Sequence, residues 1–202
     1  MPEIIPRRAE VVVIGAGAVG TSIAYHLAQR GCTDGVVLER NRIAQGASGD
    51  GAGGFRQQCS TAVNVQMTQL SLPYFLEARE RLGLDEEGLS GLDKHLDPGW
   101  AEHSADLAYR RVPTFASARV VGGWSGFYTM SPDAHGLIGA LPEPRGFSCA
   151  TGFSGHGFQH SPATGLLLSE NILDGKSTTL GIHALRPTRF AEGEPIVEKY
   201  VV

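Results

Sequence analysis

A glycine fingerprint near the N-terminus constrains this chain more than any other feature. The letters G-A-G-A-V-G at residues 15–20 match the pattern G-x-G-x-x-G. Alone such a match is weak, but a β-branched run at residues 10–14 precedes it and an apolar helical pattern at residues 19–29 follows it. A second apolar run, residues 35–39, ends in Glu39. Strand, helix and strand in this order predict a βαβ unit with two buried parallel strands.

Each part of this unit has a role in holding a dinucleotide. The first glycine permits a tight turn, the second lets the backbone approach a pyrophosphate, and the third lets the helix and strand pack closely. Free N–H groups and the dipole at the helix N-terminus favour phosphate charge. Glu39 is placed to accept hydrogen bonds from ribose hydroxyls, which argues against a 2′-phosphate. The unit predicts NAD or FAD binding; the alternative is a glycine-rich turn without a nucleotide.

Composition excludes several other classes of protein. The 202 residues carry a net charge of −4 without a basic cluster, which argues against nucleic acid as a partner. No apolar run is long enough to span a bilayer, and the proline-containing first ten residues do not resemble a signal peptide. The three cysteines are scattered, and no His or Cys spacing suggests a metal. Reduced thiols predict a cytoplasmic protein.

Weaker patterns predict the remaining elements. Residues 46–54 are rich in glycine and predict a loop. Residues 61–82 predict a helix, with a kink or a restart capped by Ser71 because Pro73 lies inside it. Residues 83–99 lack a period and predict a junction. The further predictions are a helix at 100–111, one or two strands within 118–129, a strand at 147–151, a loop at 152–157, and a helix at 162–173 with Ser161 as N-cap.

Three sequence blocks, in order, resemble one known family. They are G-A-S at 46–48 with G-G-F-R at 53–56, G-W-S-G-F-Y-T-M-S-P-D at 123–133 with G-L-I-G at 136–139, and A-T-G-F-S-G-H-G-F at 150–158 with P-A-T-G at 162–165. Together they resemble the FAD-dependent amine oxidoreductases, the group of D-amino-acid, glycine and sarcosine oxidases. The last block argues against a nicotinamide-linked dehydrogenase, which the glycine fingerprint alone leaves open.

The resemblance implies an α/β, Rossmann-like FAD-binding fold, with a mostly parallel sheet flanked by helices. It implies that FAD takes a hydride from the carbon beside an amine nitrogen. Some members attach flavin through a cysteine, but Gly126 stands at that position here, so the implied FAD is non-covalent. The implied cofactor-binding residues come from the fingerprint and from two of the blocks: Gly15, Gly17, Ala18, Val19, Gly20, Glu39, Arg40, Ala47, Ser48, Gly152, Phe153, Ser154, Gly155, His156, Gly157 and Phe158.

Three side chains are candidate catalytic residues. Arg56 resembles the arginine that pairs with a substrate carboxylate, for which a guanidinium is well shaped. Tyr128 resembles a residue on the substrate side of the flavin, and His156 lies in the block that resembles the flavin-facing segment. The plainer alternatives are a surface arginine, a core aromatic and a structural histidine. Gln159 stands where some members carry a lysine that contacts the carboxylate.

The chain departs from the family in length, because members are nearly twice as long. The missing part falls at residues 83–99, where members carry most of the substrate-binding sheet. This predicts an N-terminal part of the FAD domain at 1–82, a junction at 83–99, and a C-terminal part at 100–202 with a remnant of the substrate domain. The expected substrate is a small amine or amino acid. The alternative is a truncated, non-catalytic FAD binder, or one that needs a partner subunit or a homo-oligomer to cover its sheet edges.

Overall fold

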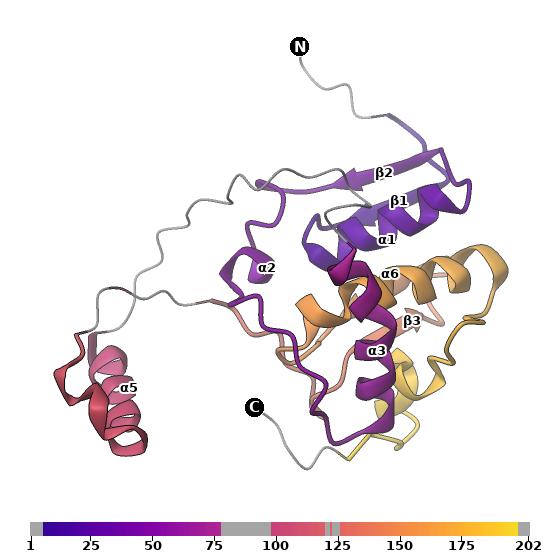
Figure 1. Cartoon of the computed structure of the whole chain (residues 1–202). Coiled ribbons are helices and arrows are strands. Elements are labelled where there is room, and N and C mark those ends of the chain that lie inside the picture. Colours follow the sequence, from indigo (N-terminus) through magenta and orange to yellow (C-terminus); the bar gives the residue numbers. More distant parts are fainter. Residues whose placement is uncertain (1–5, 78–97, 120–121, 123–125, 198–202) are drawn as a thin grey trace.

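Helix α6 is the element on which the other long helices of the core pack. The computed structural model describes residues 6–77, 98–119, 122 and 126–197. Helix α1 lies between a small sheet and α6, and α3 also packs on α6 (Figure 1). The described elements are β1 (Val11–Ile14), α1 (Ala18–Gln29), β2 (Gly35–Leu38), α2 (Ala47–Asp50), α3 (Ala62–Leu76), α5 (Pro98–Arg111), the 3₁₀ turn η1 (Pro113–Ser117), β3 (Leu137–Ala140), β4 (Ser148–Thr151), α6 (Gly157–Asp174), and the 3₁₀ turns η2 (His183–Leu185) and η3 (Pro187–Phe190).

The predicted βαβ unit is confirmed. Strands β1 and β2 are parallel and pair from Val11 with Gly35 to Ile14 with Leu38. The expectation that both strands are buried is wrong, because Val12 and Ile14 are 49% and 78% exposed. Successive side chains of a strand point to opposite faces, and α1 covers one face of this pair. The predicted α/β class is confirmed. The sheet of β1 and β2, however, is not covered on the face away from α1.

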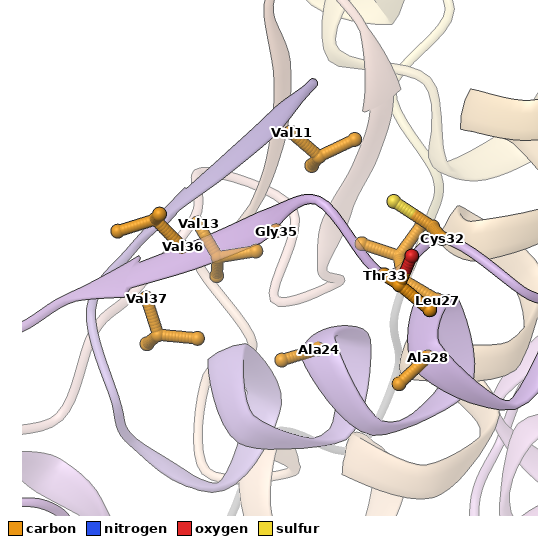
Figure 2. Close-up of a pocket in the computed structure, with 10 residues that line it drawn as sticks. All are labelled: Val11, Val13, Ala24, Leu27, Ala28, Cys32, Thr33, Gly35, Val36 and Val37. Carbon is orange, nitrogen blue, oxygen red and sulfur yellow. The ribbon is translucent and has the colours of Figure 1, made fainter. Parts of the chain in front are cut away.

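A shallow hollow of about 310 Å³ lies between this sheet and α1. Figure 2 shows that side chains from both strands and from α1 line it. Nearly all of the lining is apolar: Val11, Val13, Ala24, Leu27, Ala28, Cys32, Thr33, Gly35, Val36 and Val37. The hollow indicates that α1 alone does not fill its side of a two-stranded sheet.

Helices α1 and α6 approach closely and run parallel to one another. A Cβ atom added at Gly165 would lie 2.2 Å from Ser22 Oγ and 2.6 Å from the Ser22 carbonyl oxygen. Beyond this crossing, Arg30 at the end of α1 forms an ion pair with Asp174 at the end of α6. Because the helices touch at their middles and at their C-terminal ends, their N-termini lie at the same end of the pair. Gly165 thus allows a close approach between the N-terminal and C-terminal parts of the chain.

The start of α6 corrects the predicted boundary at Pro162. The helix begins at Gly157, and Ser161 is its fifth residue rather than its N-cap. Proline lacks an N–H, so Pro162 cannot donate to the carbonyl of Phe158 as a helical residue would. The Ser161 hydroxyl donates to that carbonyl at 2.8 Å. This replacement hydrogen bond explains why the helix tolerates proline in its second turn.

Two predictions around residues 46–82 are also corrected. Within the expected loop at 46–54, residues Ala47–Asp50 form the short helix α2. Helix α3 runs without a restart through Pro73, which lies in its last turn. Ser71 is not a cap: its buried Oγ accepts the N–H of Ala163 on α6 at 3.1 Å. Residues 78–82 lie outside the described residues.

The region after α3 agrees with the sequence predictions only in part. The helix predicted at 100–111 is confirmed as α5, which begins at Pro98, inside the expected junction. Residues 83–97 of that junction lie outside the described residues. The strands predicted within 118–129 are wrong for residues 118–119, 122 and 126–129, which are irregular. The strand predicted at 147–151 is confirmed as β4, and its antiparallel partner β3 was not predicted.

A buried ion pair connects the C-terminal tail to the rest of the fold. Arg189 is fully buried, and its Nε and Nη2 atoms each donate to an oxygen of Asp133 at 2.7 Å. The other guanidinium donors bond the carbonyls of Leu185, Arg186 and His135. All five donors of the guanidinium are thereby satisfied.

This ion pair also reaches α3. His135 Nδ1 donates to the carbonyl of Asp133 at 2.8 Å, so its Nε2 accepts from the Thr61 hydroxyl at 2.8 Å. Burial raises the pKa of Asp133, but hydrogen bonds from Arg189 and the Ile196 N–H outweigh it and hold the pKa far below its usual range. The carboxylate therefore stays charged inside the fold.

Replacing Gly165 with alanine tests the helix contact. The new methyl group would overlap the backbone of Ser22. We expect Gly165→Ala to lower the free energy of unfolding by about 1–3 kcal/mol, measured by urea denaturation. Gly181→Ala is the matched control, because a Cβ atom there meets nothing within 4 Å. Equal losses in the two variants would contradict the close contact.

Replacing Arg189 with methionine tests the ion pair. The change leaves a buried carboxylate without its cation, so we expect a loss of about 3–5 kcal/mol in unfolding free energy at neutral pH. Because the folded pKa of Asp133 is depressed, the stability it adds is present above its unfolded pKa of about 4 and is lost as pH falls below that value. The variant should lose less stability on acidification than the wild type. Arg30→Met, in an exposed pair, should cost less than about 1 kcal/mol.

Candidate functional site

The glycine fingerprint forms the turn between β1 and α1. Gly15 has φ of 104°, a left-handed value that other residues rarely adopt. A Cβ atom added at Gly20 would lie 1.9 Å from the Gly15 carbonyl oxygen, so only glycine fits there. Helix α1 then begins at Ala18 without a side-chain cap from Gly17. The N–H groups of Val19 and Gly20 in its first turn, which have no acceptor within the helix, are available to an external anion.

Two oxygen-bearing side chains engage this turn. Glu39 accepts the N–H of Ala16 at 2.8 Å through one oxygen and the N–H of Asn41 at 3.0 Å through the other. These backbone hydrogen bonds, that of Ala16 first, hold the pKa of Glu39 below its usual value. Ser48 Oγ accepts the N–H of Ala18 at 2.9 Å. Acceptors at these amides occupy the kind of position that phosphate oxygens take at a helix N-terminus.

The second half of the site is the loop at residues 152–156, between β4 and α6. Gly152, Ser154 and Gly155 all have positive φ values, of 67°, 50° and 89°. A Cβ atom at Gly155 would lie 2.3 Å from the hydroxyl of Tyr128, so the tyrosine lies directly against this loop. The Ser154 N–H donates to the Thr129 carbonyl at 2.9 Å. These contacts bring the predicted second and third sequence blocks together.

Helix α2 joins the same region through backbone contact. A Cβ atom added at Gly126 would lie 2.4 Å from Asp50 Cβ and 3.1 Å from the Asp50 carbonyl oxygen. Residues 126–131 therefore lie between α2 on one side and the loop at 152–156 on the other. Their irregular conformation, in place of the predicted strand, follows from these individual backbone contacts.

Arg56 lies against the start of α6. Its backbone N–H donates to Gln159 Oε1 at 3.1 Å, and its guanidinium Nη2 lies 3.4 Å from His156 Nε2. Arg56 is half-buried, and no carboxylate of the described residues forms an ion pair with it. The rings of His156 and His160 stack with centroids 5.3 Å apart. The structure thus places Arg56 and His156, predicted from separate blocks, in contact.

The side chains of the predicted cofactor-binding residues differ in how far they are exposed to solvent. Arg40 and Ala47 are exposed, and Ser48, Gly17 and Val19 are half-buried. Phe153 is a core residue whose ring lies beneath Gly136, so its backbone alone faces the loop. Phe158 contacts Phe75 of α3, with ring centroids 5.1 Å apart.

Sequence reasoning missed the polar contacts that fix these loops. The pairs Thr68 with His160, Thr61 with His135, and Asp133 with Arg189 all join residues more than fifty positions apart. No local spacing signals such pairs. A signal did exist for Thr68 and His160, which are polar residues within apolar helical faces and are buried with each other as partners.

The glycine fingerprint and the loop at 152–156 lie at the same end of the helix pair because α1 and α6 are parallel. Both helix N-termini, each with the positive end of its dipole, lie at the same end of the helix pair. The glycine fingerprint and Glu39 lie at the N-terminus of α1. The glycine loop at 152–156 lies at the N-terminus of α6. This arrangement defines a dinucleotide-binding α/β protein. The residues at the turn fit the adenosine diphosphate part of such a cofactor.

Comparison with known proteins identifies the family within this class. Residues 10–90 and 81–171 match the family model described as FAD dependent oxidoreductase, so the chain belongs to that family. The cofactor of this family is FAD, and the family is related to enzymes that oxidise amino acids and methylamines.

Individual relatives match about half of this chain or less. The FAD-dependent oxidoreductase domain-containing protein 1 of Xenopus laevis is 41% identical over 97 residues, which are 48% of this chain and 19% of that protein. The 4-methylaminobutanoate oxidase (formaldehyde-forming) of Paenarthrobacter nicotinovorans is 32% identical over 81 residues, 40% of this chain and 10% of that protein. The matched stretches thus span a fifth or less of these relatives' own length.

A solved structure shows the same fold. The L-proline dehydrogenase of P. horikoshii superposes with a TM-score of 0.84 and 17% identity, over 95% of this chain and 100% of that chain. Among the described residues, no helix is both long and apolar enough to cross a membrane. No group of three or more His, Cys, Asp and Glu side chains in the described part could hold a metal ion.

Proposed function

We propose that the chain binds FAD non-covalently and oxidises the C–N bond of a small amino acid or N-methyl amine. The observation that carries this proposal is the parallel packing of α1 and α6, which places the fingerprint of α1 and the glycine loop of α6 at the same end of the helix pair. When bound, FAD supplies the hydride acceptor. The protein's part is then to hold the cofactor, orient the substrate and exclude water.

The residues of the first turn hold the adenosine diphosphate part. The N–H groups of Val19 and Gly20, at the start of α1, bind the pyrophosphate. Glu39 accepts from the ribose hydroxyls, since each carboxylate oxygen has a lone pair beyond those used by Ala16 and Asn41. When the phosphate binds, it either replaces Ser48 as the acceptor of the Ala18 N–H or accepts a hydrogen bond from the Ser48 hydroxyl.

The residues of the second loop serve the flavin ring and the substrate. The backbone N–H groups at 155–158, at the N-terminus of α6, stabilise negative charge on reduced flavin. Arg56 pairs with a substrate carboxylate, and Tyr128, 61% exposed beside Gly155, lines the substrate side. His156 accepts a hydrogen bond from Arg56 and orients it. A substrate with an N-methyl amine and a carboxylate agrees with the name of the similar 4-methylaminobutanoate oxidase.

The alternative function is FAD binding without catalysis. The observation that favours it is the open outer face of the β1–β2 sheet, with Ile14 exposed. A partner subunit or a second copy of the chain would cover that face. The cytoplasmic location predicted from the cysteines remains a prediction, as do the part boundaries at 1–82, 83–99 and 100–202.

The visible spectrum of the purified chain tests the proposal. We expect yellow protein whose flavin absorption bleaches on anaerobic addition of sarcosine, glycine, proline or D-alanine. Yellow protein that none of these bleaches supports the non-catalytic alternative. Colourless protein that takes up no added FAD would overturn both.

Replacing Glu39 tests the ribose contact. We expect Glu39→Ala to weaken FAD binding about tenfold or more, because two charge-assisted hydrogen bonds to ribose are lost. The measurement is the quenching of FAD fluorescence on titration with cofactor-free protein. Glu10→Ala, at an acidic residue just before β1, is the control and should bind FAD like the wild type. Unchanged affinity of Glu39→Ala would show that Glu39 does not contact the ribose.

A further inference from the structure

A buried polar cluster joins the loop of Arg56 to helices α3 and α6. Thr68, Gln159 and His160 are 0%, 4% and 3% exposed. The Arg56 N–H lies 3.1 Å from Gln159 Oε1, Gln159 Nε2 lies 3.4 Å from Thr68 Oγ1, and Thr68 Oγ1 lies 3.0 Å from His160 Nε2. Three successive hydrogen bonds therefore connect the backbone of Arg56 to the ring of His160, and Gln159 Nε2 also lies 3.4 Å from His160 Nε2.

The donors and acceptors fix the direction of each hydrogen bond. A backbone N–H only donates, so Gln159 turns its carbonyl oxygen to Arg56 and its NH₂ to Thr68. The Thr68 hydroxyl accepts this N–H and donates its own hydrogen to His160 Nε2. The His160 proton is then on Nδ1, and it bonds the backbone of Asn64. Every hydrogen bond runs the same way, from Arg56 to Asn64.

The side chain of Arg56 fixes the second histidine in the same manner. A guanidinium only donates, so His156 Nε2 accepts from Arg56 and carries no proton. The His156 proton lies on Nδ1, 3.3 Å from the carbonyl oxygen of Phe153. Burial, followed by charge repulsion from the neighbouring His156 ring, lowers the pKa of His160 to about 3. The His160 imidazole is therefore neutral at physiological pH.

We infer that Thr68, Gln159 and His160 are positioning residues that aim the Arg56 guanidinium at the carboxylate of the substrate. This inference rests on the proposed function and deepens it. One hydrogen bond fixes the backbone of Arg56 and another, to His156, fixes its side chain. The remaining guanidinium donors suit a carboxylate. The side chain of Gln159 is neutral and positions the loop, so the positive charge that binds the substrate carboxylate comes from Arg56. The site therefore favours amino acids over amines that lack a carboxylate.

The test compares two buried threonines. Thr68→Val removes the central hydroxyl while keeping the shape of the side chain. Thr164→Val is the matched control, because Thr164 is fully buried on α6 and its hydroxyl has no hydrogen-bond partner among the described residues. The FAD-loaded full chain is titrated with benzoate, a carboxylate without an amine, and binding is followed by the flavin absorption. We expect Thr68→Val to bind benzoate about tenfold more weakly with unchanged FAD content, and Thr164→Val to bind it like the wild type.

Two outcomes of this titration overturn the inference. One is wild-type benzoate affinity in Thr68→Val, and the other is an equal loss in Thr164→Val, which indicates general loosening. Benzylamine, which lacks the carboxylate, serves as the second ligand, and its binding should not differ between the variants.

A second measurement does not depend on FAD. Imidazole ¹⁵N NMR of the cofactor-free full chain reports which ring nitrogen carries the proton. We expect the Nδ1–H form for His160 and a change of that form in Gln159→Glu, whose carboxylate has no N–H for Thr68. An Nε2–H form in the wild type, or an unchanged His160 in Gln159→Glu, overturns the inference. A chain that takes up no FAD would refute the proposed function. The positioning role is still decided in that case by the imidazole spectra and by the shift of the Arg56 guanidinium signals when benzoate is added.

Discussion

The close parallel packing of α1 on α6 is the constraint on which the rest of the structure depends. Each helix begins at one half of the site, so their relative direction decides whether the two halves can act on one ligand. Parallel alignment, fixed where Gly165 meets Ser22 and where Arg30 meets Asp174, places both N-termini at one end. An antiparallel arrangement would separate the fingerprint from the loop at 152–156 by the length of a helix. The geometry of the site therefore depends on these two helix contacts together.

Around this helix pair, buried polar contacts define the conformation of loops that bury few large apolar side chains. In the segment at 126–135 the side chains of Phe127, Tyr128 and Met130 are exposed, so hydrophobic burial alone does not order it. Asp133 binds Arg189, His135 binds Thr61, and Ser154 binds the backbone of Ser131. Because an unpaired buried polar group is costly, each contact excludes alternative loop conformations as well as stabilising this one.

The sequence predicted those features that depend on neighbouring residues. The βαβ unit, its glycine turn and helix α5 follow from local periodicity, and all three are confirmed. The family resemblance, which rests on three blocks, is confirmed by the matching family model. Boundaries were less predictable. The early start of α6 depends on the Ser161 hydroxyl replacing the N–H that Pro162 lacks, and no propensity rule anticipates that substitution. The partners of Asp133, Thr61 and Thr68 were not predictable, since they are set by the packing of distant segments.

The separation of α1 and α6 along the chain also determines the order in which the protein can fold. The unit from β1 to β2 is contiguous in sequence, and its turn and helix can form as soon as those residues collapse. Arg30 and Asp174, in contrast, are 144 residues apart, so docking of α6 must close a long loop against chain entropy. We therefore expect the glycine turn to form early and the loop at 152–156 to form late. A nucleotide held by the early turn would meet the second half of its site only when the last helix docks.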